Sequence, residues 1–254
     1  MFTEYERFVR EELKRWEQEL TQEPGVLERL SRQFSREVNR HIPEKIHQAI
    51  AAGIRTMIES IRVGIQFTPK GDLKRGETLP VMDRLAEERV AKWTQWASAE
   101  GAGTGLGGFK LSLIDFPALL SIKMKMLSDL AYIYGFDPNE EQERLFLLSV
   151  FQLEYAEASR KKEILSKIKT WDGSSRYPAL TDMNEIDWQQ FQQDYRDSLD
   201  FKKLLQIVPG IGAVIGAWAN YGLVKSLGKT AINAYRLRVL EGRILEEERT
   251  LEDK

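Results

Sequence analysis

Apolar residues recur at intervals of three or four along most of the chain, which is the periodicity of helices. The clearest case is a row of isoleucines between residues 46 and 65, which forms one continuous ridge. Such a ridge is the usual core-facing side of a bundle helix, and an amphipathic membrane-surface helix is the alternative. Residues 2–20 also predict a helix, an exposed one. Its apolar stripe consists of Phe8, Leu13, Trp16 and Leu20.

Breaks in this pattern divide the chain. Residues 68–80 carry a proline near each end and two internal glycines, which predicts a long loop. We therefore expect an N-terminal helical region over 1–80 and a helical domain over 81–254, together forming one compact unit. Asp83 is a candidate N-cap for the next helix. A later helix is expected to end at Gly135, and another to begin after Asp137.

Two segments are unusually rich in small residues. Residues 101–108 hold five glycines, and residues 204–224 hold no charge and four glycines. The second segment is about as long as a membrane-spanning helix, although its proline, amides and glycines lower its hydropathy. Gly212 and Gly216 form a G-x-x-x-G pattern, which lets two helix backbones approach closely. Spanning, partial insertion and a buried hairpin all remain open for this segment.

No alternating strand pattern and no fixed-period repeat interrupts the helices. The sequence therefore predicts an all-α, multi-helix bundle in which the two glycine-rich apolar helical segments pack together. These segments supply the candidate contacts with a membrane or ligand. The candidates are Gly101, Gly103, Gly105, Gly107, Gly108, Phe109, Pro209, Gly210, Gly212, Gly216, Trp218 and Asn220.

The sequence gives little support for any known catalytic motif. A G-x-G-x-x-G match at residues 103–108 follows a charged helix instead of a buried strand, so a nucleotide loop is not expected. Glu100 and Asp115 are weak candidates for an acid or base, since apolar surroundings can raise a carboxyl pKa. A helix-end charge or an ion pair for Glu100 and an N-cap for Asp115 are the alternatives. His41 and His47 lack zinc spacing, so no metal or cofactor is expected.

Composition narrows the class of protein. The chain of 254 residues has no cysteine, a net charge of −2 and a pI near 5.9. This balance argues against nucleic acid as a partner, because nucleic-acid binding normally needs a basic surface. The first residues are charged and lack the apolar core of a signal peptide. We therefore expect a cytoplasmic protein.

Several short motifs in a fixed order resemble the EcsC family of bacterial proteins. They span residues 81–240 and begin with the W-x-x-W helix that leads into E-G-A-G-T-G-L-G-G-F. They continue with I-D-F-P, Y-G-F-D, P-G-I-G-A-V-I-G-A-W-A-N and A-I-N-A-Y-R-L-R. The family is named for a gene that accompanies an ABC transporter linked to protein secretion. The resemblance supplies no catalytic residue, and it implies a peripheral, membrane-associated accessory role.

Three functional hypotheses follow from these patterns. The first is a non-enzymatic accessory protein at the inner face of the cell membrane, whose partner is membrane lipid or a membrane protein. The second is a helical binder of a lipid or acyl chain in an apolar pocket. The third is an uncharacterised lipid-acting enzyme that uses Glu100 or Asp115. We favour the first, and the oligomeric state stays open.

Overall fold

A computed structural model describes residues 2–22, 48, 51–57, 59, 76–105, 109–172, 189–190 and 212–252. Side chains are described for a smaller set, which omits residues 100–118, 158, 212–220 and 245–252. The described chain is helical and contains no strand, which confirms the all-α prediction. Its helices are α1 (Glu4–Thr21), α4 (Leu79–Gly105), α5 (Phe109–Ile133), α6 (Glu141–Tyr155), α7 (Ala158–Lys169) and α10 (Gly212–Glu252).

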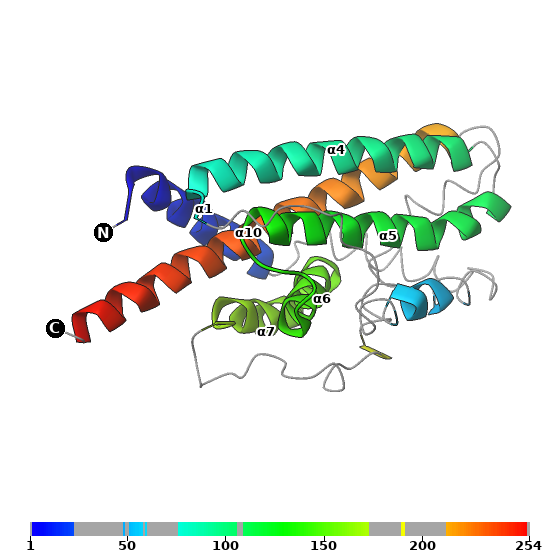
Figure 1. Ribbon diagram of the computed structural model, residues 1–254. Coiled ribbons are helices and arrows are strands. Elements are labelled where there is room, and N and C mark those ends of the chain that lie inside the picture. Colours follow the sequence, from blue (N-terminus) through cyan, green and yellow to red (C-terminus); the bar gives the residue numbers. More distant parts are fainter. Residues whose placement is uncertain are drawn as a thin grey trace.

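Helix α10 organises the bundle. Its 41 residues contact α1, α4, α5, α6 and α7, and its most extensive contact is with α4. Figure 1 shows α4 and α5 as two long neighbouring helices, with α10 passing alongside them and α6 and α7 on one side. The other described helices therefore all meet on one long element.

Small buried residues lie on both α4 and α10. Ala86 and Ala97 of α4 and Ala231 of α10 are fully buried. A Cβ atom placed on Gly228 would lie 2.5 Å from Cγ1 of Val90, closer than real Cβ contacts allow. Only glycine fits at that position without displacing the valine, so the two helix backbones approach closely there.

Helix α1 is capped as helix chemistry demands, but its buried face differs from the predicted stripe. The Thr3 hydroxyl accepts from the Glu6 backbone N–H, and the Glu6 carboxylate accepts from the Thr3 N–H. Val9, Leu13 and Trp16 are buried, whereas Phe8 is 54% exposed. Phe8 was placed on the wrong face, because spacings of four and three from residue 9 define the face that packs.

Two predicted helix starts are displaced. Helix α4 begins at Leu79, so Asp83 lies inside the helix and is buried, and it is not the N-cap. Helix α6 begins at Glu141 with Glu140 as N-cap, whereas the carboxylate of Asp137 accepts from the backbone N–H of Asn139 within the preceding turn. The break at Gly135 is confirmed, since this residue has a φ of +87° that favours glycine.

Only part of the isoleucine ridge lies among the described residues. Ile54 and Met57 are buried in the core, as the core-facing interpretation expects, and the rest of the ridge lies outside the described residues. The division at residue 80 stays a prediction.

Candidate functional site

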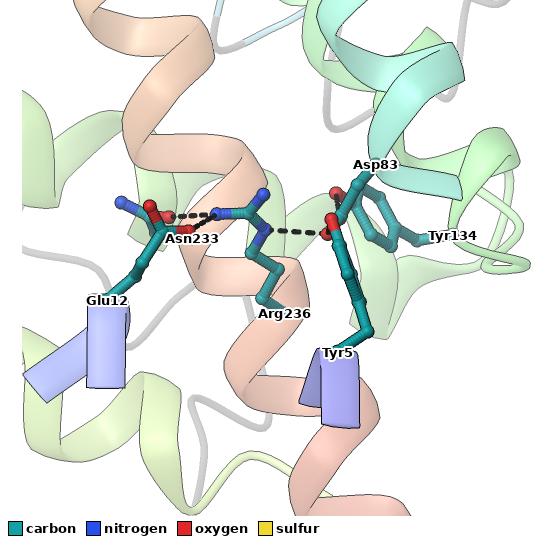
Figure 2. Close-up of polar contacts among 6 residues, drawn as sticks. All are labelled: Tyr5, Glu12, Asp83, Tyr134, Asn233 and Arg236. Atoms are coloured by element: carbon teal, nitrogen blue, oxygen red, sulfur yellow. Dashed lines mark hydrogen bonds and ion pairs between the residues drawn. The ribbon is translucent and has the colours of Figure 1, made fainter. Parts of the chain in front are cut away.

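A buried carboxylate, Asp83, joins four parts of the bundle. It is 2% exposed and accepts the Tyr5 hydroxyl at 2.8 Å, the Tyr134 hydroxyl at 2.5 Å and Nε of Arg236 at 3.0 Å. These donors come from α1, from the turn after α5 and from α10 (Figure 2). We call Asp83, Tyr5, Tyr134 and Arg236 the Asp83 clamp.

The electrostatics of the Asp83 clamp keep its donors protonated. Burial and the hydrogen bond to Asp83 raise the pKa of Tyr5 to about 12. Burial and the charge of Asp83 hold the pKa of Tyr134 well above its usual value. Burial alone would lower the pKa of Arg236, but the hydrogen bond and charge of Asp83 raise it overall. The negative charge of Asp83 is thus balanced by Arg236, and its oxygens accept hydrogen bonds from all three donors, as buried polar groups require.

A second buried network lies further along α10. Glu143 accepts from the Tyr235 hydroxyl and from Arg238, whose guanidinium also donates two hydrogen bonds to Asp172. Cζ of Arg238 lies 3.8 Å from the ring centroid of Phe136. Burial raises the pKa of Glu143 and outweighs the opposing charge of Arg238. This network ties α10 to α6 and to the turn after α7.

A cleft of about 790 Å³ opens beside the Asp83 clamp, between α1, α4 and α10. Trp16, Val90 and Ile232 contribute apolar surface to it. Its volume lies within the range of small-molecule sites. Arg236 lines the cleft and also holds Asp83, so the cleft and the Asp83 clamp share a residue.

Cations outnumber carboxylates in the cleft by four to three. The cations are Arg15, Lys225, Lys229 and Arg236, and the carboxylates are Glu12, Glu19 and Glu87. Nη1 of Arg236 lies 3.4 Å from Oε2 of Glu12. Within the described part of the chain, the other three cations have no carboxylate within ion-pair distance.

Two exposed aromatic residues lie beyond the Asp83 clamp on the same helix pair. Trp96 of α4 is 70% exposed, and Tyr221 of α10 is 41% exposed and lines the cleft. Trp93 anchors its neighbour, because it donates to the buried Asp129 and its ring meets that of Trp96 edge-on at 6.0 Å. The exposed ring of Trp96 therefore packs against a side chain that is itself held in place by Asp129.

The candidate residues from the sequence belong to the helix ends. Glu100 and three of the glycines lie in the last turns of α4, and Asp115 lies within α5, so it is not an N-cap. Gly212, Gly216, Trp218 and Asn220 lie in the first turns of α10, and Phe109 begins α5. Gly107, Gly108, Pro209 and Gly210 lie outside the described residues. The side chains of the others are not among those described, so their contact roles stay predictions.

The described residues hold no cluster of histidine, aspartate or glutamate suited to a metal ion. Among the described helices, none is long and apolar enough to cross a membrane.

Sequence reasoning missed the residues that line the cleft and hold Asp83. Asp83 was read as a cap, and Asn233 and Arg236 were noted only as part of the motif A-I-N-A-Y-R-L-R. A usable signal was present, because both residues continue the polar stripe of Lys225 and Lys229 at helical spacing. Glu12, a partner of Arg236, lies 224 positions away, and Tyr5 lies 78 positions from its partner Asp83.

The ordered motifs and the all-α fold define the class of protein. The chain belongs to the EcsC protein family, whose model matches residues 8–240. This match starts well before residue 81, where the motifs had suggested that the resemblance begins. It includes Asp83, Tyr134 and Arg236 of the clamp, and Tyr5 lies just outside it.

The particular relatives come from one bacterium. The chain is 39% identical to the "Protein EcsC" of Bacillus subtilis (strain 168) over 235 residues, which cover 92% of this chain and 96% of that protein. It is 37% identical to the "Uncharacterized protein YdbA" of the same bacterium over 178 residues, covering 70% and 65% of the two chains. No solved structure matches the chain.

Proposed function

We propose that this protein is a non-enzymatic, peripheral membrane-associated accessory protein that docks through the Trp96 end of the α4–α10 pair. The observation that carries the proposal is the 70% exposure of Trp96. Such an exposed indole in water is unfavourable, whereas tryptophan and tyrosine are enriched at membrane interfaces because one end is apolar and the other polar.

The charges near this end support the same proposal. Lys92 is exposed on α4 one turn before Trp96, and Lys225 lies with its ammonium 5.5 Å from the Tyr221 ring centroid. Cations beside an aromatic anchor are attracted to anionic lipid within about 10 Å of the membrane surface. We extend the proposal to the inner face of the cell membrane and to an ABC transporter, because the family is named for a gene that accompanies one.

Flotation with vesicles tests this proposal. Wild type is mixed with phosphatidylglycerol vesicles and with phosphatidylcholine vesicles, and the bound fraction is measured. We expect binding that is stronger to the anionic vesicles and weaker at high salt. Trp96→Gln should weaken binding about tenfold, since burying one large apolar side chain in the interface contributes that much.

Phe8→Gln is the matched control, because Phe8 is another exposed aromatic residue, on α1. It should leave flotation unchanged. A second variant, Gly212→Leu with Gly216→Leu, asks whether the start of α10 also enters the interface. Wild type that stays unbound with both lipids would contradict the proposal, and equal losses in Trp96→Gln and Phe8→Gln would contradict docking at this end.

The cleft favours a second candidate, a helical protein that binds a lipid in a pocket. Its volume of about 790 Å³ can hold a ligand, and its apolar surface from Trp16, Val90 and Ile232 suits an organic portion. Membrane docking and ligand binding are compatible with each other, because Trp96 lies outside the cleft lining.

A further inference from the structure

Three cations and one amide of α10 follow one another along the cleft. Lys225, Lys229, Asn233 and Arg236 all line it, and their spacings of four, four and three residues put them on a single helix stripe. We call these four residues the donor stripe. It runs about 16 Å along the helix, from a rise of about 1.5 Å per residue.

Two members of the donor stripe are almost fully buried and have a nitrogen left over. Asn233 is 5% exposed, and its carbonyl oxygen accepts from Nη1 of Arg236 at 3.3 Å. Arg236 is 8% exposed and uses Nε for Asp83 and Nη1 for Glu12 and Asn233. Within the described part of the chain, Nδ2 of Asn233 and Nη2 of Arg236 have no hydrogen-bond partner, and the latter carries no dashed line in Figure 2.

These two nitrogens are not sealed in the protein interior. A fully enclosed side-chain nitrogen without a partner occurs among the described residues only at Nε of Arg144. Nδ2 of Asn233 and Nη2 of Arg236 therefore keep contact with solvent, and the solvent space that both residues border is the cleft. The side chains that carry these donors are almost fully buried, so the two donors are held toward one space and are available to an acceptor that enters it.

The charges beside these donors suit an anionic acceptor. Lys225 and Lys229 come from the same helix face, and Arg15 faces them from α1. None of the three is paired with a carboxylate within the described chain. The carboxylates that line the cleft belong to the other two helices, α1 and α4, and Glu12 is already beside Arg236.

We propose that the donor stripe binds a phosphate group, held by Asn233 and Arg236 at the inner end of the cleft and by Lys225, Lys229 and Arg15 further out. Phosphate oxygens accept several charge-assisted hydrogen bonds at once, which matches a row of donors without acceptors. The apolar surface from Trp16, Val90 and Ile232 accommodates the organic portion of a phosphate-bearing ligand. The phosphate can belong to a lipid headgroup or to a soluble ligand, and the probes below distinguish these two sources.

The experiment is a calorimetric titration of the full chain, without vesicles. The probes are inorganic pyrophosphate and dihexanoyl phosphatidic acid below its micelle concentration, with sulfate as the reference anion. We expect at least one phosphate probe to bind more tightly than sulfate, and salt to weaken that binding. Because no membrane is present, failure here is distinguishable from failure of membrane docking, which only flotation measures.

Two variants locate the binding. Asn233→Asp keeps the side-chain oxygen that accepts from Arg236, but it replaces the donor Nδ2 by a negatively charged oxygen. The double variant Lys225→Gln with Lys229→Gln removes two positive charges from exposed side chains. Each should weaken the phosphate probe about tenfold or more, as loss of charge-assisted hydrogen bonds does. Lys162→Gln, an exposed lysine of α7 outside the cleft lining, is the matched control and should bind as wild type. The melting temperature of each variant confirms its fold.

The outcomes separate the sources. Binding of both probes, or of pyrophosphate alone, with loss in the two variants supports a phosphate site that needs no lipid. Binding of phosphatidic acid alone, with the same loss, assigns the phosphate to a lipid headgroup. The proposal is overturned if neither probe exceeds sulfate, or if folded Asn233→Asp and Lys225→Gln/Lys229→Gln bind as tightly as the control.

Discussion

Helix α10 carries two kinds of cation, and their surroundings differ completely. Arg236 and Arg238 are 8% and 9% exposed, and each is held by buried carboxylates. Lys225 and Lys229, two to three turns earlier, are exposed and have no carboxylate partner in the described chain. The same helix thus changes from a paired half, whose cations meet buried carboxylates, to an open half.

This difference separates cations that hold the fold, Arg238 entirely and Arg236 in part, from lysines available only to a ligand. Arginine presents a planar fork that satisfies several acceptors at once, which suits the pairing of Arg238 with Asp172 and Glu143. Lysine carries a point charge on a flexible stem and is best kept in solvent. The paired half should therefore govern stability, and the open half should govern binding.

The largest expected effect comes from breaking the paired half. Arg238→Met leaves Glu143 buried without its cation and leaves Asp172 without its two hydrogen bonds. Removal of one partner from a buried ion pair costs about 3–5 kcal/mol. We expect the free energy of unfolding, measured with urea, to fall by this amount. A loss below about 1 kcal/mol would show that the network adds little stability.

The close approach of α10 to α4 at Gly228 gives the next largest effect. Gly228→Ala places a methyl group against Val90 and should destabilise the protein by about 1–3 kcal/mol, the usual range for overpacking. Adding Val90→Ala removes the clash, so the double variant should be more stable than the sum of the single losses predicts. Strict additivity in urea unfolding would argue against the close approach.

Alkaline pH tests the contribution of the buried tyrosines to stability. Burial and adjacent carboxylates hold the pKa values of Tyr134 and Tyr235 well above 10 in the folded protein. The unfolded chain loses these protons first, so their contribution is complete below pH 10 and declines as the pH rises above it. Above pH 10, each tyrosine should lower the free energy of unfolding by up to about 1.4 kcal/mol per pH unit.

Urea unfolding at pH 9, 10 and 11 measures this decline. Tyr134→Phe should reduce the slope above pH 10. Equal slopes in wild type and Tyr134→Phe would contradict the role assigned to the hydroxyl of Tyr134.

The smallest expected effect on stability lies in the open half. Lys225→Gln with Lys229→Gln removes no ion pair in the described chain, so the free energy of unfolding should change by less than about 0.5 kcal/mol. A loss above 1 kcal/mol would show that these lysines belong to the architecture, and the contrast between the two halves would disappear.

Local sequence determined the helices and some of their ends. The spacing of apolar residues, the acid and threonine that cap α1, and Gly135 with its positive φ all act within one or two turns, so they can be read along the chain. The ordered motifs identified the family for the same reason, because each is short and contiguous. Close packing at a glycine occurs at Gly228, and the packing expected of the two glycine-rich segments stays a prediction.

Only the tertiary structure decided which charged residues are buried and which line the cleft. Asp83 meets Tyr5 across 78 positions and Arg236 across 153, and no local spacing encodes such pairs. Likewise, Asn233 and Arg236 face the cleft only because α1 and α4 close around that side of α10. Helix periodicity specifies the face on which a residue lies, but the helices that pack against that face determine whether its charge is paired, buried or open to a ligand.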